Sequence, residues 1–217
     1  MRYGVLGTGE VGRTLAGRLV ELGHEVTLGS RTADNPVARE WATAVAGRAH
    51  AGTFAQAAEA GDAVINAVSG RVALDALRAV GAAHLDGKIL VDVCNPLSFE
   101  GGLPRLDPVE SDSMGERIQR AFPGARVVKT LNTVNVEVMV DPGRVPGGHH
   151  LFVCGEDTLA KERVTAWLGD FGWPAERVLD LGGIAAARAT EMYLPLWLQM
   201  SRVFGHADFN IEVRQAG

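Results

Sequence analysis

Residues 2–12 of the chain read RYGVLGTGEVG, a short apolar run followed at once by a G-x-G-x-x-G motif. The apolar run predicts a buried strand over 2–6. Apolar residues recur at helical spacing after the motif as far as Gly23, and residues 25–29 then read as a second strand. A strand, a glycine-rich turn, a helix and a second strand form the βαβ unit that binds dinucleotides in Rossmann-type proteins.

The three glycines of the motif each permit a different close approach. Gly7 allows the tight turn, Gly9 lets the backbone approach a pyrophosphate, and Gly12 lets the helix pack closely on the sheet. The helix N-terminus then offers N–H groups and a positive dipole end to phosphates. Such a motif alone is weak evidence, but here it has the structural context that it requires. We therefore predict dinucleotide binding, at Gly7, Thr8, Gly9, Glu10, Val11 and Gly12.

The loop after the second predicted strand indicates which dinucleotide is bound. An NAD site usually carries Asp or Glu there, whereas this chain reads GSRT over 29–32. A carboxylate would repel a 2′-phosphate, but a hydroxyl and a guanidinium can bind one. Arg31 alone would be read as a surface arginine; its place beside the expected adenine ribose favours NADP. We predict that Ser30, Arg31 and Asn35 contact the cofactor, Asn35 standing at the expected cap of the next helix.

Composition and charge narrow the classes of function. The chain has 217 residues, an apolar fraction of 47% and a formal net charge of −5, which is ordinary for one α/β domain with or without a small appendage. No basic run stands out, so we expect neither nucleic acid nor a membrane as a partner. No stretch reaches the ~20 apolar residues of a transmembrane helix, and a strand begins at residue 2, so we expect a cytoplasmic protein without a leader peptide.

The cysteines and histidines do not form a metal-binding pattern. Cys94 and Cys154 match no zinc or redox spacing, and we expect both to be buried free thiols in a reducing cytosol. The six histidines are scattered, without acidic neighbours at ligand spacing. We therefore expect no metal site.

Apolar runs alternate with helical patterns along the rest of the chain. The further expected strands are 49–52, 62–68, 88–93, 125–130, 150–154 and 177–181. The further expected helices are 37–45, 55–60, 72–80, 114–122 with an exposed charged face, one from about 136, and 158–168. This alternation predicts an α/β fold with a doubly wound, mostly parallel sheet, whose ligand lies outside the carboxyl ends of the strands.

The residues at those carboxyl ends are the candidates for the rest of the site. Polar or turn-forming residues follow three of the expected strands, and residues 99–105 form a glycine- and proline-bearing loop that we predict to be a flexible wall. Asn135 is readily explained as a helix cap, but Asn132 is not. The candidate cofactor contacts at these ends are Val68, Asn95 and Pro96, and the substrate-cleft candidates are Asn132, Val134 and Lys129.

The sequence pattern changes after Gly182, where the alternation of strands and helices ends. Residues 184–204 predict one long helix, kinked at Pro195, with apolar and aromatic residues too dense for a helix that has a free face. We expect it to roof the active site, to form a dimer contact, or both. A short tail strand is expected over 209–213. The predicted organisation is an NADP-binding Rossmann domain over 1–182 and a small, mainly helical segment over 183–217.

Taken together, these stretches resemble the NADPH-dependent F420 reductases, also called F420-dependent NADP oxidoreductases, over nearly the whole chain. The resemblance rests on residues 7–12, 23–31, 153–157 and 194–196, the Gly-Ser-Arg element at 29–31 being the most specific. Residues 92–96 and 129–133 also resemble the NADPH domains of membrane ferric reductases, which widens the range of acceptors.

The resemblance implies a homodimer with a deazaflavin stacked on the nicotinamide in the cleft. It implies that residues 8–11 hold the pyrophosphate, that Ser30 and Arg31 hold the 2′-phosphate, and that Val68, Asn95 and Val136 line the nicotinamide half. The chain departs from the family pattern at Asn132, where we expect histidine, and at residues 67–70, where a bulkier Thr-Ile-Pro-Trp is expected. Both departures fall where the second substrate should lie.

Hydride transfer between two stacked rings requires position and water exclusion more than acid–base groups. The chain shows no Ser-His-Asp set and no paired carboxylates, so no catalytic residue is certain, and an ion pair or a snorkelling side chain explains Lys129 equally well. The leading hypothesis is an NADP-dependent oxidoreductase that passes hydride between NADPH and coenzyme F420 or a similar flavin-like carrier. The alternatives are an NADPH-dependent reductase of a small imine or carbonyl substrate, which usually needs a longer helical domain, and a non-catalytic NADP-binding sensor module.

Overall fold

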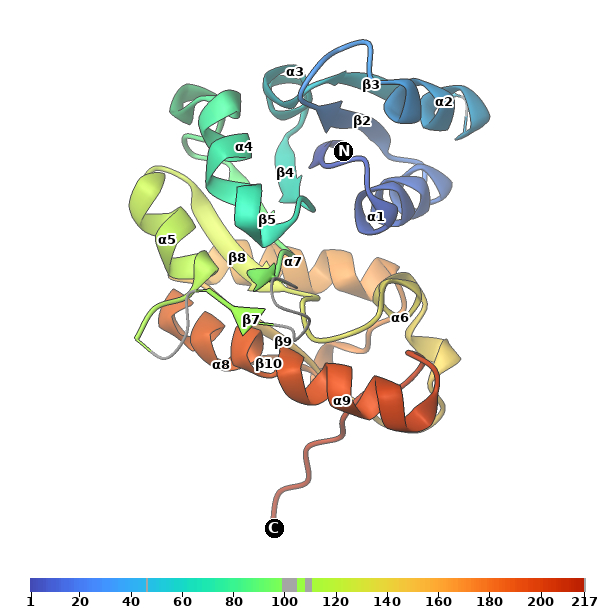
Figure 1. Ribbon diagram of the computed structural model, residues 1–217, viewed down its shortest axis with the longest axis vertical. Coiled ribbons are helices and arrows are strands. Elements are labelled where there is room, and N and C mark those ends of the chain that lie inside the picture. Colours follow the sequence, from blue (N-terminus) through green and yellow to red (C-terminus); the bar gives the residue numbers. More distant parts are fainter. Residues whose placement is uncertain (46, 99–104, 108–110, 217) are drawn as a thin grey trace.

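The computed structural model describes residues 1–45, 47–98, 105–107 and 111–216, and an eight-stranded sheet forms the centre of this part of the chain (Figure 1). The strands are β1 Arg2–Leu6, β2 Glu25–Ser30, β3 Ala49–Thr53, β4 Ala63–Asn66, β5 Ile89–Asp92, β8 Arg126–Thr130, β9 Leu151–Cys154 and β10 Val178–Asp180. Their order is β10-β9-β8-β5-β4-β1-β2-β3. All neighbours are parallel except β8 and β9, which are antiparallel. The prediction of a doubly wound, mostly parallel sheet is confirmed.

Helices cover both faces of the sheet, and each face has its own hydrophobic core. One core includes α1 Glu10–Glu21, α2 Pro36–Val45, α6 Val136–Val140 and α7 Thr158–Asp170, and the other includes α3 Phe54–Ala60, α4 Ala73–Val80, α5 Met114–Ala121 and the start of α8 Ala187–Met192. Successive strand residues point to opposite faces. Val5 and Val91 thus enter the first core, whereas Leu6 and Leu90 enter the second.

Helix α5 is more buried than the sequence indicates. Arg117 and Arg120 lie on the predicted charged face, but Glu116 on the same helix is only 8% exposed. The prediction of an exposed charged face is therefore wrong at Glu116. The reason is that α8 packs against α5 and supplies Arg188 as the partner of this carboxylate.

The single helix predicted over 184–204 is divided into α8 and α9 Leu194–Phe204, with a 3₁₀ turn over Ile184–Ala186 before them. Tyr193 separates the two helices, and Pro195 lies in the first turn of α9. Proline is tolerated there because the first N–H groups of a helix have no intrahelical partner. The predicted change of direction at Pro195 thus occurs as a break between two helices.

The tail strand predicted over 209–213 does not form. One backbone hydrogen bond joins His150 N to Ile211 O at 2.9 Å, and side chains make the other contacts with the start of β9. Figure 1 shows the end of the chain running away from the body of the molecule. A single ladder bond is too little to align the tail with the sheet.

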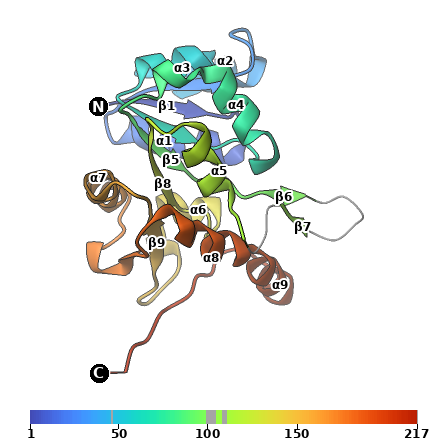
Figure 2. The ribbon, with the colours of Figure 1, turned by 90° about the vertical axis from the view of Figure 1, so that its left-hand side faces the viewer.

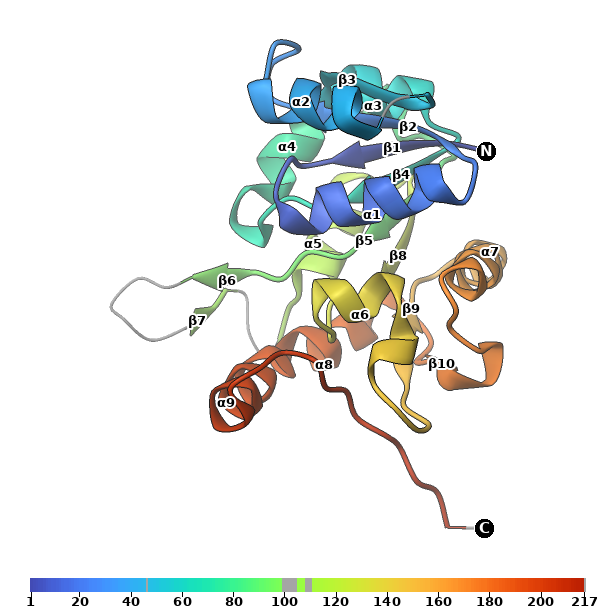
Figure 3. The ribbon, with the colours of Figure 1, turned by 90° about the vertical axis from the view of Figure 1, so that its right-hand side faces the viewer.

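A small antiparallel pair, β6 Leu97–Ser98 and β7 Arg105–Leu106, is not predicted from the sequence. Figures 2 and 3 show that it projects from the body of the molecule on the side where α9 lies. Most of the loop predicted as a wall of the site, residues 99–104, lies outside the described residues. None of the helices in the described part of the chain has the length and apolar character needed to cross a membrane.

Candidate active site

The carboxyl edge of the sheet carries two adjoining cavities. The chain leaves the sheet in opposite directions after β1 and β4, which are neighbours, and ligands of doubly wound folds bind at such a switch point. One cavity, of about 590 Å³, lies against the ends of β1 and β2, and the other, of about 430 Å³, against the ends of β4, β5 and β8. We call them the β1–β2 cavity and the β5–β8 cavity. Both include Ala67, Val68 and Ser69 in their walls, so the two form adjacent parts of one cleft.

Most of the predicted cofactor residues line one or the other of these two cavities. The β1–β2 cavity is lined by Gly7, Thr8, Gly9, Ser30, Arg31, Asn35 and Val68. The β5–β8 cavity is lined by Glu10, Val11, Val68, Asn95 and Val136, together with the cleft candidates Asn132 and Val134. Val68 stands between the two groups.

Three predicted residues do not line either cavity. Gly12 lies inside α1, and Pro96 faces a separate cavity of about 310 Å³, where its carbonyl accepts a hydrogen bond from Asp107 N. Lys129 is enclosed beneath the cleft, with no exposed side-chain surface. The prediction that Lys129 lies in the substrate cleft is therefore wrong, because its side chain points into the protein toward two carboxylates.

The glycine turn shows why the motif needs Gly7 and Gly12, and it leaves open space beside Gly9. Gly7 has a φ of +113°, and a Cβ there would lie 2.8 Å from the carbonyl oxygen of Ala67. A Cβ on Gly12 would collide with the carbonyl oxygen of Gly7. A Cβ on Gly9, by contrast, would meet no atom within 4 Å, so this backbone borders open space. The first turn of α1 has no side-chain cap, and its N–H groups fit a diphosphate approaching from that space.

The loop after β2 presents a cation at the far end of the β1–β2 cavity. Arg31 is exposed there, whereas Ser30 is only 4% exposed and its hydroxyl donates to the carbonyl of Thr32. Asn35 caps α2, because its Oδ1 accepts a hydrogen bond from Ala38 N at 3.1 Å. The guanidinium of Arg31 is thus the side chain best placed to meet a 2′-phosphate, and Ser30 must rotate its hydroxyl to donate to one.

Two asparagines hold the ends of β5 and β8 together at the floor of the β5–β8 cavity. Asn95 Nδ2 donates to the backbone oxygen of Asn132 at 2.8 Å, and Asn132 Nδ2 donates to Asn95 Oδ1 at 3.1 Å. Leu131, just before Asn132, has a φ of +62°, which is uncommon for a residue other than glycine. This buried turn directs Asn132 toward Asn95.

The roof of the same cavity comes from α9. Leu194, Trp197 and Leu198 line it, and Trp197 stacks on Phe209 of the tail with ring centroids 5.3 Å apart. The sequence indicates a roof helix but not which side chains face inward. Residues of α3 and α4 in the β1–β2 cavity are also missed by sequence reasoning, although they follow a strand end as the predicted residues do; they are Phe54, Asp75, Ala76 and Ala79.

The ammonium group of Lys129 has three acceptors beneath this floor. It lies 2.9 Å from Asp92 Oδ2 and 3.0 Å from Glu191 Oε1, and it donates to the carbonyl oxygen of Cys94. Burial alone would lower the pKa of Lys129, but the attraction of Asp92 and Glu191 outweighs it and raises that pKa above its usual value. The ion-pair explanation of Lys129 is confirmed.

Both cysteines are buried free thiols, as predicted. Burial raises the pKa of Cys154 to about 12 and also raises that of Cys94. Cys94 lines the β5–β8 cavity, and its raised pKa favours the thiol over the thiolate, which is the nucleophilic form.

Comparison with known proteins agrees with this geometry. A family model described as NADP oxidoreductase coenzyme F420-dependent matches residues 2–96. The F420-dependent NADP reductase of Methanothermobacter marburgensis is 30% identical over 212 residues, covering 93% of this chain and 92% of that protein. A solved structure from Arthrobacter sp. FB24, described as a candidate F420-dependent NADP reductase, is 47% identical with a TM-score of 0.93 and 99% coverage of both chains.

A second kind of relative is larger. The metalloreductase STEAP3 of Rattus norvegicus is 33% identical over 200 residues, which cover 90% of this chain but only 38% of the metalloreductase. The likeness to the Methanothermobacter marburgensis reductase, in contrast, extends over nearly the full length of both proteins. The chain therefore belongs to the family of F420-dependent NADP oxidoreductases and is an NADP-linked oxidoreductase.

Proposed function

We propose that this enzyme transfers a hydride between NADPH and coenzyme F420 or a similar flavin-like carrier. The observation that carries the proposal is the pair of adjoining cavities, one with the glycine turn and Arg31, the other with apolar walls and two asparagines. The relative from Methanothermobacter marburgensis is named for this pair of substrates and matches nearly the whole chain.

The proposed position of NADP follows the two cavities. The diphosphate lies at Thr8, Gly9 and the start of α1, and Arg31 binds the 2′-phosphate with Ser30 and Asn35 beside it. The nicotinamide then enters the β5–β8 cavity past Val68. The acceptor occupies the remainder of that cavity, between the asparagine floor and the α9 roof.

The two ring systems supply the reactive carbons, so the work of the protein is to position them and exclude water. Val68, Val134 and Val136 give the cavity apolar walls, and the α9 side chains cover it. Asn95 and Asn132 are the polar groups of the floor and orient the amide or carbonyl groups of the bound rings. In this proposal no side chain serves as a general acid, and Lys129 acts only through its neighbours.

The acceptor is tested by following the absorbance band of oxidised F420 near 420 nm after adding NADPH. Loss of the band at a rate proportional to enzyme supports the proposal. An unchanged band, with NADPH binding shown by fluorescence, rejects F420 as the acceptor. A flavin is the next acceptor to assay, because the proposal includes flavin-like carriers, and a ferric complex follows, since a relative named a metalloreductase is 33% identical to this chain. Turnover of an imine or ketone panel without deazaflavin indicates a small-substrate reductase, and binding without any turnover indicates a sensor.

We also propose that the enzyme is a homodimer that associates through the outer face of α9. Leu196 is 56% exposed and Val203 is 72% exposed, whereas Trp197 on the same helix faces the cavity. Val203→Asp should therefore shift the protein to the monomer in sedimentation velocity. Leu159→Asp is the matched control, because Leu159 is 64% exposed on α7. Equal sedimentation of the Val203→Asp variant and the wild type refutes this interface.

A further inference from the structure

Lys129 contacts residues next to both the floor and the roof of the β5–β8 cavity. On one side its ammonium donates to the carbonyl of Cys94, the residue that precedes Asn95 in the floor. On the other side it lies 3.0 Å from Glu191 Oε1 on α8, shortly before Leu194 begins the roof. Asp92 is its third partner and lies on the floor strand β5. One buried ammonium thus joins the floor to the segment that carries the roof.

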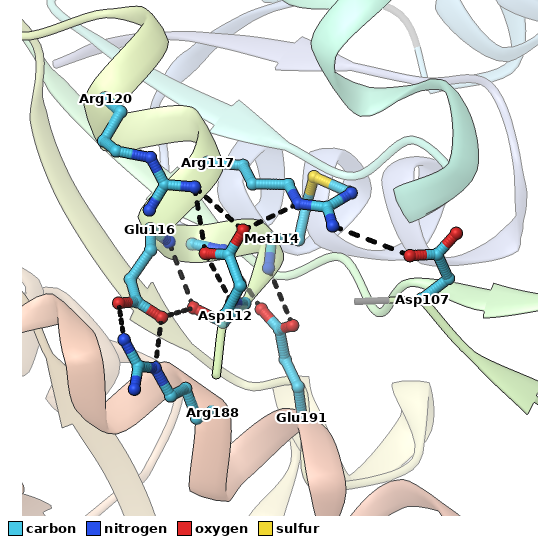
Figure 4. Close-up of polar contacts among 10 residues, drawn as sticks. Asp107, Asp112, Met114, Glu116, Arg117, Arg120, Arg188 and Glu191 are labelled. Carbon is cyan, nitrogen blue, oxygen red and sulfur yellow. Dashed lines mark hydrogen bonds and ion pairs between the residues drawn. The ribbon is translucent and has the colours of Figure 1, made fainter. Parts of the chain in front are cut away.

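Glu191 meets hydrogen-bond donors at both of its oxygens. Oε1 accepts from Gly115 N at 3.1 Å besides contacting Lys129, and Oε2 accepts from Met114 N at 2.8 Å. Figure 4 shows this carboxylate reaching the start of α5. A glutamine would have to turn its NH₂ group toward another donor, so only a carboxylate satisfies the site. The N-terminus of α5 and the Lys129 ammonium together offset the negative charge of the two buried carboxylates, Asp92 and Glu191.

A second polar link joins the same two helices without reaching the cavity. Glu116 Oε2 accepts from Arg188 Nε at 2.7 Å, and the second guanidinium nitrogen pairs with Oε1 (Figure 4). Arg188 is 38% exposed, and neither residue lines the cleft. The α5–α8 junction therefore offers one link that passes beneath the cavity and one that does not.

We propose that Lys129 and Glu191 are positioning residues that set the spacing between the asparagine floor and the α9 roof. Resting on the proposed function, this assigns them to the fit of the hydride acceptor and not to the binding of NADP. The adenosine end of the cofactor lies against the β1–β2 cavity, whose walls include no residue of α8 or α9. Breaking the ion pair between Lys129 and Glu191 should let the α9 roof move away from the floor, while NADP stays bound.

The test compares Glu191→Gln with the matched control Glu116→Gln. Glu191→Gln should lower kcat/KM for F420 by about 10–100-fold, because small displacements of reacting groups have effects of this size. The loss should fall mainly on the KM for F420, and the dissociation constant for NADPH should change little. Glu116→Gln should lower the melting temperature but leave both constants near the wild-type values. Glu191→Asp keeps the negative charge and should lower kcat/KM for F420 less than Glu191→Gln does. This variant replaces Glu191→Gln in the test if Glu191→Gln does not fold.

A readout without any acceptor separates this proposal from the proposed function. Trp41, Trp167 and Trp173 are at most 8% exposed, so acrylamide should quench mainly the half-buried Trp197 of the roof. Quenching should rise in Glu191→Gln and stay unchanged in Glu116→Gln. If the wild type fails to reduce F420, the proposed acceptor is wrong and the quenching still tests the roof. Equal behaviour of the two variants in quenching and KM overturns the positioning role.

Discussion

Asn95 and Asn132 bind each other reciprocally across the ends of two neighbouring parallel strands. Each side chain donates its amide nitrogen to the other residue, at 2.8 and 3.1 Å, so the two loop ends cannot separate without breaking both bonds. This pair forms the polar floor of a cavity that is otherwise mostly apolar. Asn132 also stands where the family pattern leads us to expect histidine.

Exchanging Asn132 for aspartate should destabilise the protein. A carboxylate at this position faces Asn95 Oδ1, an acceptor, so the bond at 3.1 Å is replaced by repulsion. We expect the free energy of unfolding to fall by about 1–3 kcal/mol, the usual cost of a buried group left without its partner. Urea denaturation measures the change. Asn132→Ala removes the hydrogen bond without adding repulsion, so its free energy of unfolding should fall less than that of Asn132→Asp. A larger fall in Asn132→Ala would contradict the assigned orientation of the amide.

Arg31→Ala should weaken the binding of NADP and leave that of NAD almost unchanged. Loss of a hydrogen bond to a charged group costs about 1.5–3 kcal/mol, and only NADP carries the 2′-phosphate. Titration of both nucleotides by calorimetry or fluorescence measures the difference. Arg39→Ala is the control, because Arg39 is exposed on the nearby helix α2 but does not line the cavity. Equal losses of NADP and NAD affinity in Arg31→Ala would refute the 2′-phosphate site.

Two glycines of α1 should respond oppositely to alanine. A Cβ on Gly12 collides with the carbonyl of Gly7, so Gly12→Ala should destabilise the protein by about 1–3 kcal/mol and weaken NADP binding. A Cβ on Gly17 meets no atom within 4 Å, so Gly17→Ala should stabilise it by about 0.5–1 kcal/mol. Thermal unfolding and NADP titration compare the two variants. Loss of NADP affinity in both variants would contradict a specific role for Gly12.

The contact between the tail and the sheet should weaken in mild acid. The backbone N–H of Val213 donates to His150 Nδ1 at 3.1 Å, so this nitrogen must be unprotonated. Burial, followed by Arg177 and His149, lowers the pKa of His150, and Glu212 opposes them. Because the folded pKa is lowered, the stabilising contribution is present above the unfolded value of about 6.5 and is lost as pH falls through the folded pKa.

Hydrogen exchange measures this effect on the tail. Exchange of the amides at 209–213 should accelerate below about pH 6.5, after correction for the intrinsic rate. His150→Phe removes the titrating acceptor and should give fast exchange at every pH. A wild-type pH dependence retained in this variant would show that another group controls the tail.

Much of the fold is encoded locally, and the sequence predicts it correctly. The spacing of apolar residues predicts all eight strands of the sheet, and the motif at 7–12 predicts the turn at the switch point. Gly7 and Gly12 illustrate the reason: Gly7 has a positive φ, and a Cβ on Gly12 would collide with the carbonyl oxygen of Gly7, only five residues away. The break near Pro195 is local in the same sense, because proline cannot occupy the interior of a helix without cost.

The disagreements concern contacts between segments far apart in the chain. Lys129 lies next to the end of a strand, which makes it a candidate for the cleft, but Asp92 and Glu191 hold its ammonium inside the protein. Residues 209–213 have a strand-like composition, yet a strand forms only where a sheet edge offers a full set of partners. The helical pattern of α5 predicts that Glu116 is exposed, but α8 packs over it and supplies Arg188 as its partner.

By itself, the sequence determined the βαβ unit, its glycine turn and the position of Arg31 after β2, because these depend on backbone preferences and spacing within some thirty residues. Only the tertiary structure decided that Asn95 bonds Asn132, that Trp197 faces the cavity, and that Lys129 joins its floor to its roof. Those relationships depend on which distant elements pack together, and a local pattern in the chain does not specify that.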